Sequence, residues 1–253
     1  MNRRRTPKYD TDYFSLFSIE KKYVCSNIIF PMLEEYIQID SVVDIGCGVG
    51  AWLKYFHEKC IDIVGIDNDW VPVEYLVIPN ESFITQDLNE EITFPRRFSL
   101  AICIEVAEHL KPDRAKSFVS DIVRLSDHIL FSAAIPGQGG VGHINEQYPE
   151  YWAEFFADED YAPYDFLRPR IWNSDAIEHP WLKQNVLLYV KNGCTSRIPF
   201  EYKAGLSNLT IIEKYYYEKV IRDYWYRFGR TVLGNMIKAI TRGVGKVFLK
   251  HLH

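Results

Sequence analysis

Residues 41–190 alternate between short apolar runs and segments whose apolar residues recur at helical spacing. The apolar runs predict strands at Val42–Ile45, Ile63–Ile66, Ser82–Thr85, Phe98–Ile104 and His128–Ser132. The helical spacing predicts helices at Ala51–Lys59, Arg114–Leu125 and Tyr148–Phe156. A chain that alternates strand and helix builds a mainly parallel sheet with helices on both faces, so the pattern predicts an α/β fold.

Further elements are predicted on either side of this pattern. Before it, apolar residues at helical spacing predict a helix at about Ile19–Tyr36, with Ser18 as its N-cap. After it, apolar runs predict the last strands at Tyr164–Leu167 and Val186–Val190. Because ligands of such sheets bind beyond the carboxyl ends of the strands, the residues that follow strands are the first candidates for a site.

The first predicted strand ends in a glycine-rich turn, Asp44-Ile45-Gly46-Cys47-Gly48-Val49-Gly50. Gly46 allows the chain to turn with a positive φ, and Gly48 lets a ligand approach the backbone because it has no Cβ. We expect Gly50 to let the next helix pack closely against the sheet. The start of that helix then offers unpaired N–H groups to a ligand.

The glycine spacing alone does not identify the ligand. Gly46, Gly48 and Ala51 also satisfy the G-x-G-x-x-G/A pattern of nicotinamide-binding folds, so a dinucleotide-dependent oxidoreductase stays an alternative. Two acidic residues narrow the choice. Asp44 is placed to hold a cationic amino group, and Asp67 ends the second strand about 20 residues further on, where a ribose-binding acid is expected.

With these acids and the segment Gln86-Asp87-Leu88, residues 40–190 resemble the class I S-adenosylmethionine-dependent methyltransferases. The resemblance implies a Rossmann-like fold with a mainly parallel seven-stranded sheet, whose last two strands form an antiparallel edge hairpin. It also implies S-adenosyl-L-methionine as cofactor. The cofactor contacts that it implies are Asp44, Gly46, Cys47, Gly48, Gly50, Asp67, Asn68, Asp87, Leu88, Ile104 and Glu105.

The central predicted strand ends in a second motif, Glu105-Val106-Ala107-Glu108-His109. Glu105, Glu108 and His109 are spaced i, i+3 and i+4, so they share one face if the segment turns helically. Two carboxylates and an imidazole suit a divalent ion such as Mg²⁺ or Mn²⁺. His143, on the glycine-rich loop after the next strand, is a candidate fourth ligand. A metal-free site, with Glu105 on the cofactor and His109 in the core, stays an alternative.

The Glu-x-x-Glu-His motif resembles two groups of O-methyltransferases, which methylate catechols in ubiquinone biosynthesis and the terminal 2′-hydroxyl of small RNAs. Both groups hold a divalent ion with this motif and act on vicinal oxygens, which implies Glu105, Glu108 and His109 as metal ligands. A metal that binds two adjacent oxygens orients the acceptor and lowers the pKa of its hydroxyl. The candidate catalytic residues are His143, His109 and Glu146, with His143 as general base if it is not a ligand.

The loop Phe131–Gly140 and the segment His143-Ile144-Asn145-Glu146-Gln147 are similar to a group of bacterial and viral methyltransferases. Members of that group often occur beside glycan-assembly enzymes. We therefore expect an O-methyltransferase that acts on a vicinal diol of a small molecule, sugar or glycan. The alternatives are a catechol or quinone precursor, an RNA ribose, and a non-catalytic protein that binds a partner.

Composition and charge narrow these alternatives. The chain has 253 residues, 47% of them hydrophobic and 25% charged, which fits one α/β domain with additions. Its net charge of -5 argues against nucleic acid as a partner. The five cysteines include no C-x-x-C pair, so we expect reduced thiols in a cytoplasmic protein. No apolar run has the length of a membrane span.

The last part of the chain has a different character. We expect a methyltransferase domain over residues 1–205 and an aromatic, then basic, extension over residues 206–253. From Trp225 onward there is no acidic residue, and four basic residues recur at every fourth position: Lys238, Arg242, Lys246 and Lys250. Such a helix either lies peripherally on an anionic membrane or packs on the domain or on a second copy in a homodimer.

Overall fold

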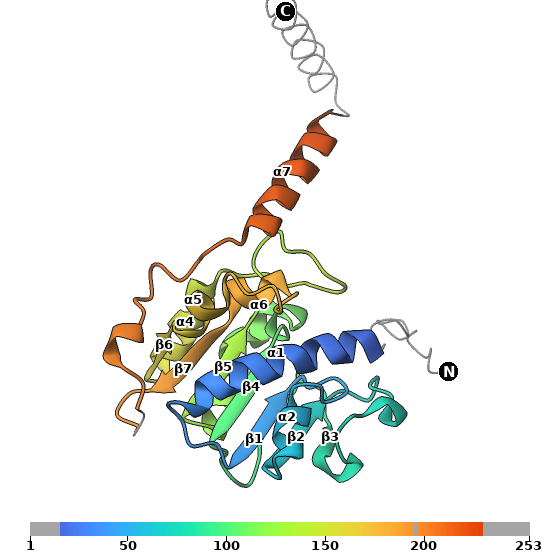
Figure 1. Cartoon of the computed structure of the whole chain (residues 1–253), viewed down its shortest axis with the longest axis vertical. Helices are drawn as coiled ribbons and strands as arrows, with labels where there is room; N and C mark the ends of the chain where they lie inside the picture. The colour runs from blue at the N-terminus through green and yellow to red at the C-terminus, as the bar shows by residue number, and fades with distance from the viewer. Residues whose placement is uncertain (1–15, 195–196, 230–253) are drawn as a thin grey trace, which may run out of the picture. The chain divides into compact units, whose positions relative to one another are not determined.

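The computed structural model describes residues 16–194 and 197–229, whose helices and strands are shown in Figure 1. The chain divides into two compact units, Met1–Ile211 and Ile212–His253. The first unit contains the whole sheet, and it extends six residues beyond the boundary predicted from the sequence because Leu209 is buried in its core. The second unit contains helix α7 (Lys214–Gly229), and the four basic residues from Lys238 onward lie outside the described residues.

The sheet has seven strands in the order β3-β2-β1-β4-β5-β7-β6. In chain order the strands are β1 (Ser41–Ile45), β2 (Asp62–Asp67), β3 (Phe83–Thr85), β4 (Leu100–Ile104), β5 (His128–Ser132), β6 (Tyr161–Tyr164) and β7 (Leu187–Lys191). Strands β1 to β5 pair in parallel, whereas β7 pairs antiparallel with both β5 and β6. The expected parallel sheet with an antiparallel pair at one edge is therefore confirmed.

Helices cover both faces of this sheet (Figure 1). Successive strand residues face opposite sides, so Val43 and Val42 belong to two separate core clusters. One cluster packs the sheet against α3 (Ala115–Leu125) and α4 (Pro149–Asp158). The other packs it against α1 (Leu16–Glu34), α2 (Leu53–Glu58), α5 (Leu167–Ile171) and α6 (Pro180–Asn185).

Short 3₁₀ turns connect several of these elements. They are Val73–Tyr75, Asn80–Ser82, Ala107–His109, Pro112–Arg114 and Phe200–Tyr202. All five cysteines are free thiols. Within the described ranges, every helix is too short or too polar to cross a lipid bilayer.

Three predicted element boundaries are wrong. The strand predicted at Tyr164–Leu167 is three residues earlier, because β6 is an edge strand and tolerates Pro163, which has no N–H for a ladder bond. Ser18 lies inside α1 and is not its N-cap. Helix α2 begins at Leu53 because the residues before it continue the glycine turn.

Candidate active site

The turn after β1 has open space above its backbone. Gly46 has φ +79°, and a Cβ there would lie 2.3 Å from Cγ2 of Val106, so only glycine fits. At Gly48, with φ +54°, a Cβ would meet no other described atom within 4 Å. A ligand can therefore contact the backbone of Gly48 directly.

Gly50 has a different neighbour from the one expected. A Cβ on Gly50 would lie 2.8 Å from Cγ1 of Ile78, so this glycine permits close packing of the connection between β2 and β3, not of a helix on the sheet. Cys47 and Ile104 have buried side chains in the core cluster on the α1 face. A Cβ on Gly65 would lie 2.7 Å from Sγ of Cys47, which shows how closely that thiol packs against β2.

Two buried carboxylates lie beside this turn. Asp67 accepts hydrogen bonds from the backbone N–H groups of Gly48 and Asn68, both at 2.7 Å, and burial raises its pKa to about 6. Oδ2 of Asp44 is buried without a hydrogen-bond partner among the described residues. Burial, with a smaller contribution from the charge of Asp67, raises the pKa of Asp44 to about 8. A buried carboxylate oxygen without a hydrogen-bond partner is suited to a cationic ligand group.

The segment after β3 reaches the same edge of the sheet. The N–H of Gln86 donates to the carbonyl of Asp67 at 2.7 Å, which fixes the two strand ends side by side. Asp87 is exposed and its carboxylate accepts from the N–H of Asn89 at 2.9 Å, whereas Leu88 is buried. The predicted cofactor residues of β1, β2 and β3 therefore lie along one edge.

Beyond β4, the structure brings Glu108, His109 and His143 together. One potential ligand atom from each lies within 4.8 Å of the others, and carboxylate oxygen and imidazole nitrogen are the donor types that divalent ions bind. The backbone N–H groups of Ile144 and Asn145 donate to the carbonyl of Glu108 at 2.9 and 3.0 Å, so the loop that carries His143 is fixed to the motif after β4.

Glu108 is fully buried, and both of its carboxylate oxygens are without a hydrogen-bond partner among the described residues. Burial, and then the charge of Glu105, hold its pKa well above the usual range. The nearby N–H groups of Glu108 and Ala134 offset part of that rise, although they do not reach hydrogen-bonding geometry. A buried carboxylate in this state needs a cation or a proton, so the donor set fits a divalent ion.

Both histidines are oriented by an acceptor at Nδ1. Nδ1 of His109 lies 3.3 Å from the carbonyl of Gly142, and Nδ1 of His143 lies 2.9 Å from Oε1 of Glu146. Donation from Nδ1 leaves the lone pair on Nε2, as in most metal-binding histidines. Nε2 of His143 faces Oε1 of Glu108 at 3.9 Å.

Glu105, also expected as a metal ligand, is not among the three residues whose ligand atoms lie together. It has φ +55°, and its carboxylate accepts hydrogen bonds from Ser132 at 2.9 Å, Gln138 at 2.6 Å and Asn185 at 3.1 Å. Burial raises the pKa of Glu105, and these three donors offset part of the rise. Glu105 therefore joins β4, β5, the glycine-rich loop and α6 rather than facing the cluster.

Glu146, a predicted catalytic residue, supports the loop that carries His143. Its carboxylate accepts from the N–H groups of Gly137 at 2.9 Å and Gly139 at 2.8 Å, as well as from His143. Partial burial raises its pKa, but these hydrogen bonds outweigh that effect and leave the pKa below its usual value. The carboxylate is occupied by three donors and cannot readily take a further proton.

Residues 16–131 match the family model described as a methyltransferase domain. This part of the chain is an S-adenosylmethionine-dependent methyltransferase domain. The match decides between the two cofactor classes that the glycine spacing allowed, in favour of S-adenosylmethionine. No curated protein matches the methyltransferase significantly.

The chain is similar to several solved structures. A candidate O-methyltransferase from Nostoc punctiforme PCC 73102 is 11% identical over 71% of this chain and 59% of its own, with a TM-score of 0.50. Magnesium protoporphyrin IX methyltransferase from Synechocystis PCC 6803, with bound SAH, is 17% identical over 69% and 84% of the two chains, with a TM-score of 0.47. The methyltransferase domain of bacterial CtHen1 is 15% identical over 68% of this chain and 99% of its own, with a TM-score of 0.47.

Sequence reasoning missed three parts of the site. Gln138 and Asn185 are buried and bonded to each other at 2.9 Å, and Gly140 packs against the imidazole of His143. A signal for Gln138 was present, since a single amide among glycines is unusual. Asn185 comes from α6, so only the fold brings it to Glu105.

Proposed function

We propose that this methyltransferase transfers the methyl group of S-adenosylmethionine to a hydroxyl of a vicinal diol, with a sugar or glycan as the acceptor class. A divalent ion, Mg²⁺ or Mn²⁺, would be held by Glu108, His109 and His143. The observation that carries the proposal is the buried carboxylate of Glu108, whose oxygens have no hydrogen-bond partner among the described residues and which lies close to His109 and His143. When bound, the ion supplies charge that lowers the pKa of an adjacent hydroxyl.

Other residues of the chain bind the cofactor and support the segments that carry Glu108 and His143. The open backbone at Gly48 and the carboxylates of Asp44 and Asp67 receive the cofactor at one end of the sheet edge. The sulfonium methyl is already activated, so the protein mainly aligns it with the acceptor oxygen. Glu105 and Glu146 fix the two segments that carry Glu108 and His143, which keeps the acceptor side of the site rigid.

Apolar side chains on the loop around the cluster support an acceptor with a ring face. Val141, Ile144 and Tyr148 are all exposed although they are large and hydrophobic. Val141 and Ile144 flank His143, and Tyr148 precedes α4. Exposed apolar residues beside polar ligands are typical of pockets that bind the faces of sugar or aromatic rings. They do not favour a polyanionic backbone, which agrees with the net charge of -5.

A catechol or quinone precursor is the second candidate acceptor. It has the same vicinal oxygens, and its aromatic ring suits the same three apolar side chains. The metal cluster does not distinguish the two classes, because chelation depends on the oxygens alone.

The experiment is a screen of acceptors with methyl-labelled S-adenosylmethionine, with and without Mg²⁺. Sugars with vicinal hydroxyls, catechols and short RNAs are compared with analogues in which one of the two oxygens is already methylated or absent. Label in vicinal diols only, and only with metal, supports the proposal. Label in carboxylates, amines or isolated hydroxyls contradicts it.

A further inference from the structure

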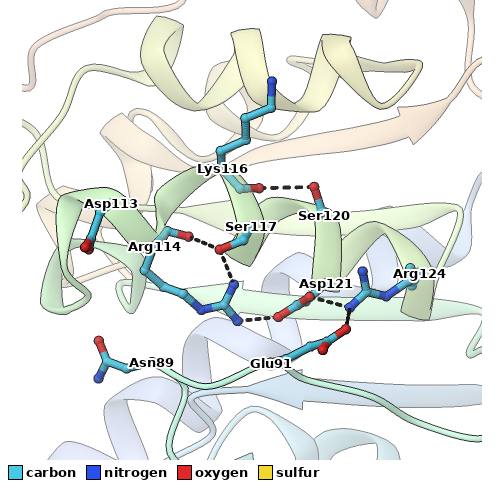
Figure 2. Close-up of a pocket in the computed structure, with 9 residues that line it drawn as sticks. All are labelled: Asn89, Glu91, Asp113, Arg114, Lys116, Ser117, Ser120, Asp121 and Arg124. Atoms are coloured by element: carbon cyan, nitrogen blue, oxygen red, sulfur yellow. Dashed lines mark hydrogen bonds and ion pairs between the residues drawn. The ribbon is translucent and has the colours of Figure 1, made fainter.

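A polar groove of ≈ 550 Å³ runs along α3 on the first unit, outside the cluster described above (Figure 2). Charged side chains line it, and Figure 2 shows that those of Arg114, Asp121, Arg124 and Glu91 point toward one another, whereas Lys116 points away from them. Arg114 pairs with Asp121, and Arg124 pairs with both Asp121 and Glu91. These four residues form one ion-pair network in which Arg114 and Asp121 are buried.

Arg114 is the centre of this network and is only 8% exposed. Its guanidinium donates to the carbonyl of Leu88 through Nε at 3.3 Å and to the carbonyl of Glu90 through Nη2 at 2.8 Å. Nη1 donates to Oγ of Ser117 at 2.7 Å, within its own helical segment. One side chain thus fixes two carbonyls of the segment after β3 to the start of α3, which a planar five-donor group can do and a point charge cannot.

Asp121, 2% exposed, holds the far end of the same segment. Its Oδ2 accepts from the backbone N–H of Ile92 at 2.9 Å as well as pairing with Arg114. Arg124, which pairs with Oδ1 of Asp121, also donates to the carboxylate of Glu91 at 3.1 Å. Residues 88–92 are therefore held to α3 at both ends by one buried ion pair.

This segment lies directly beside the cofactor end of the sheet. Gln86 donates its N–H to the carbonyl of Asp67 at 2.7 Å and its side-chain amide to the carbonyl of Glu91 at 2.8 Å. The loop from Asp87 to Ile92 is thus attached to Asp67 on one side and to α3 on the other. Arg114 follows His109 by five residues, so the same side chain connects the chain segment of the metal cluster with the cofactor edge.

We propose that Arg114 and Asp121 are positioning residues for S-adenosylmethionine. They hold residues 86–92 in place beside Asp67, at the edge of the sheet where the cofactor binds. They do not touch the cofactor. Their loss lets the segment move away from Asp67, so cofactor affinity falls while the metal cluster keeps its geometry. The inference rests on cofactor binding by the domain and not on the acceptor or the metal, so the two proposals fail separately.

The test is calorimetric titration of the full chain with S-adenosylhomocysteine, with Mn²⁺ titration as a second readout. Arg114→Lys keeps the charge beside Asp121 but loses the two carbonyl contacts, and we expect the Kd for S-adenosylhomocysteine to rise about tenfold. The Kd for Mn²⁺ is expected to change by less than about twofold, because the hydrogen bonds of Arg114 go to Leu88, Glu90 and Ser117.

Arg97→Lys is the matched control. Arg97 also donates to backbone carbonyls of α3, those of Val123 and Arg124, but it pairs with Asp127 and does not hold residues 88–92. It should leave both dissociation constants unchanged. If Arg114→Lys does not fold, Arg124→Gln is the second variant, and it should raise the Kd for S-adenosylhomocysteine by about threefold.

An unchanged Kd for S-adenosylhomocysteine in a folded Arg114→Lys, or in Arg124→Gln when that variant replaces it, overturns the inference. An equal rise in Arg97→Lys also overturns it, because general loosening of α3 would then explain the effect. A parallel rise in the Kd for Mn²⁺ would show that the ion pair supports the whole fold rather than the cofactor edge.

Discussion

Gly140 lies directly against the imidazole of His143: a Cβ on residue 140 would come within 2.2 Å of Nε2. That nitrogen is the atom that faces Glu108. The missing side chain at position 140 therefore provides the space in which the imidazole reaches the cluster. The contact links the glycine-rich loop to the chemistry of the site through packing alone.

Gly140→Ala should therefore impair metal binding without unfolding the protein. The new methyl group rotates the imidazole away from Glu108, and the end of a histidine side chain moves at little cost to the fold. We expect the affinity for Mn²⁺ to fall about tenfold or more, with S-adenosylhomocysteine affinity unchanged. Titration calorimetry measures both.

Gly205→Ala is the control for this prediction, since a Cβ at position 205 meets no other described atom within 4 Å. It should leave both affinities and the melting temperature unchanged. Full Mn²⁺ affinity in Gly140→Ala would show that His143 is not a ligand.

Glu146→Gln separates loop support from base catalysis. The amide keeps one of the two oxygens that accept from the N–H groups of Gly137 and Gly139, and it loses the charge that orients Nδ1 of His143. Loss of such an orienting carboxylate weakens metal sites about 10- to 100-fold. We expect methyl transfer to fall at low Mn²⁺ and to recover at saturating Mn²⁺. A kcat that stays low at saturating metal would instead make Glu146 the base.

Asp44 should make cofactor binding dependent on pH. Its pKa is about 8, raised by burial and by the charge of Asp67 and lowered by Lys22, whereas its usual value is 3.8. A cationic group of the cofactor favours the charged carboxylate, so binding at pH 7 should release a proton. Calorimetry in buffers of different ionisation enthalpy measures this release, which Asp44→Asn should abolish.

The same shift fixes the sign of the stability change with pH. Between pH 3.8 and about 8 the folded protein holds a proton on Asp44 that the unfolded chain has lost, so the stability of the cofactor-free protein should fall as pH rises through this window. Asp44→Asn should flatten that fall. The control is Asp62→Asn, whose exposed residue lies at the end of β2 opposite to Asp67. This variant should show the same fall in stability with pH as the wild type. An equal slope in Asp44→Asn would contradict the assignment.

Membrane contact by the basic extension stays a prediction from sequence. A variant with Gln at positions 238, 242, 246 and 250 should lose binding to anionic vesicles. Each basic residue near the surface contributes about 1 kcal/mol to the free energy of membrane binding. Wild-type binding should weaken with salt. Vesicle binding that is equal for wild type and variant would favour packing on the domain or a homodimer, which sedimentation would then test.

The sequence predicted the sheet well because local pattern decides it. Val42–Ile45 and His128–Ser132 are apolar runs that are buried on both faces, and such runs have few other solutions. The predicted bounds of β6 were wrong, because the edge position of this strand outweighs the poor strand propensity of Pro163. That outcome depends on the neighbouring strand and not on the residue.

For the site, the sequence predicted Glu105, Glu108, His109 and His143 together, and the structure groups the last three. The i, i+3, i+4 spacing assumes a continuous helical turn from Glu105. The structure has a positive φ at Glu105 and a 3₁₀ turn that begins only at Ala107, so Glu105 faces another direction. Its partners Gln138 and Asn185 are distant in sequence, and although Gln138 stands out as an amide among glycines, only the fold brings Asn185 to Glu105.

The most direct measurement for the central claim is thermal unfolding with increasing Mn²⁺, in wild type and in Glu108→Gln. Binding at 100 times Kd stabilises by about 2.7 kcal/mol, which for a chain of this size is a rise of roughly 5–10 °C in Tm. We predict that rise in wild type and its absence in Glu108→Gln, which should fold without metal at least as well because it buries no carboxylate. An equal rise in both proteins, or none in wild type, would contradict a metal centre at this cluster.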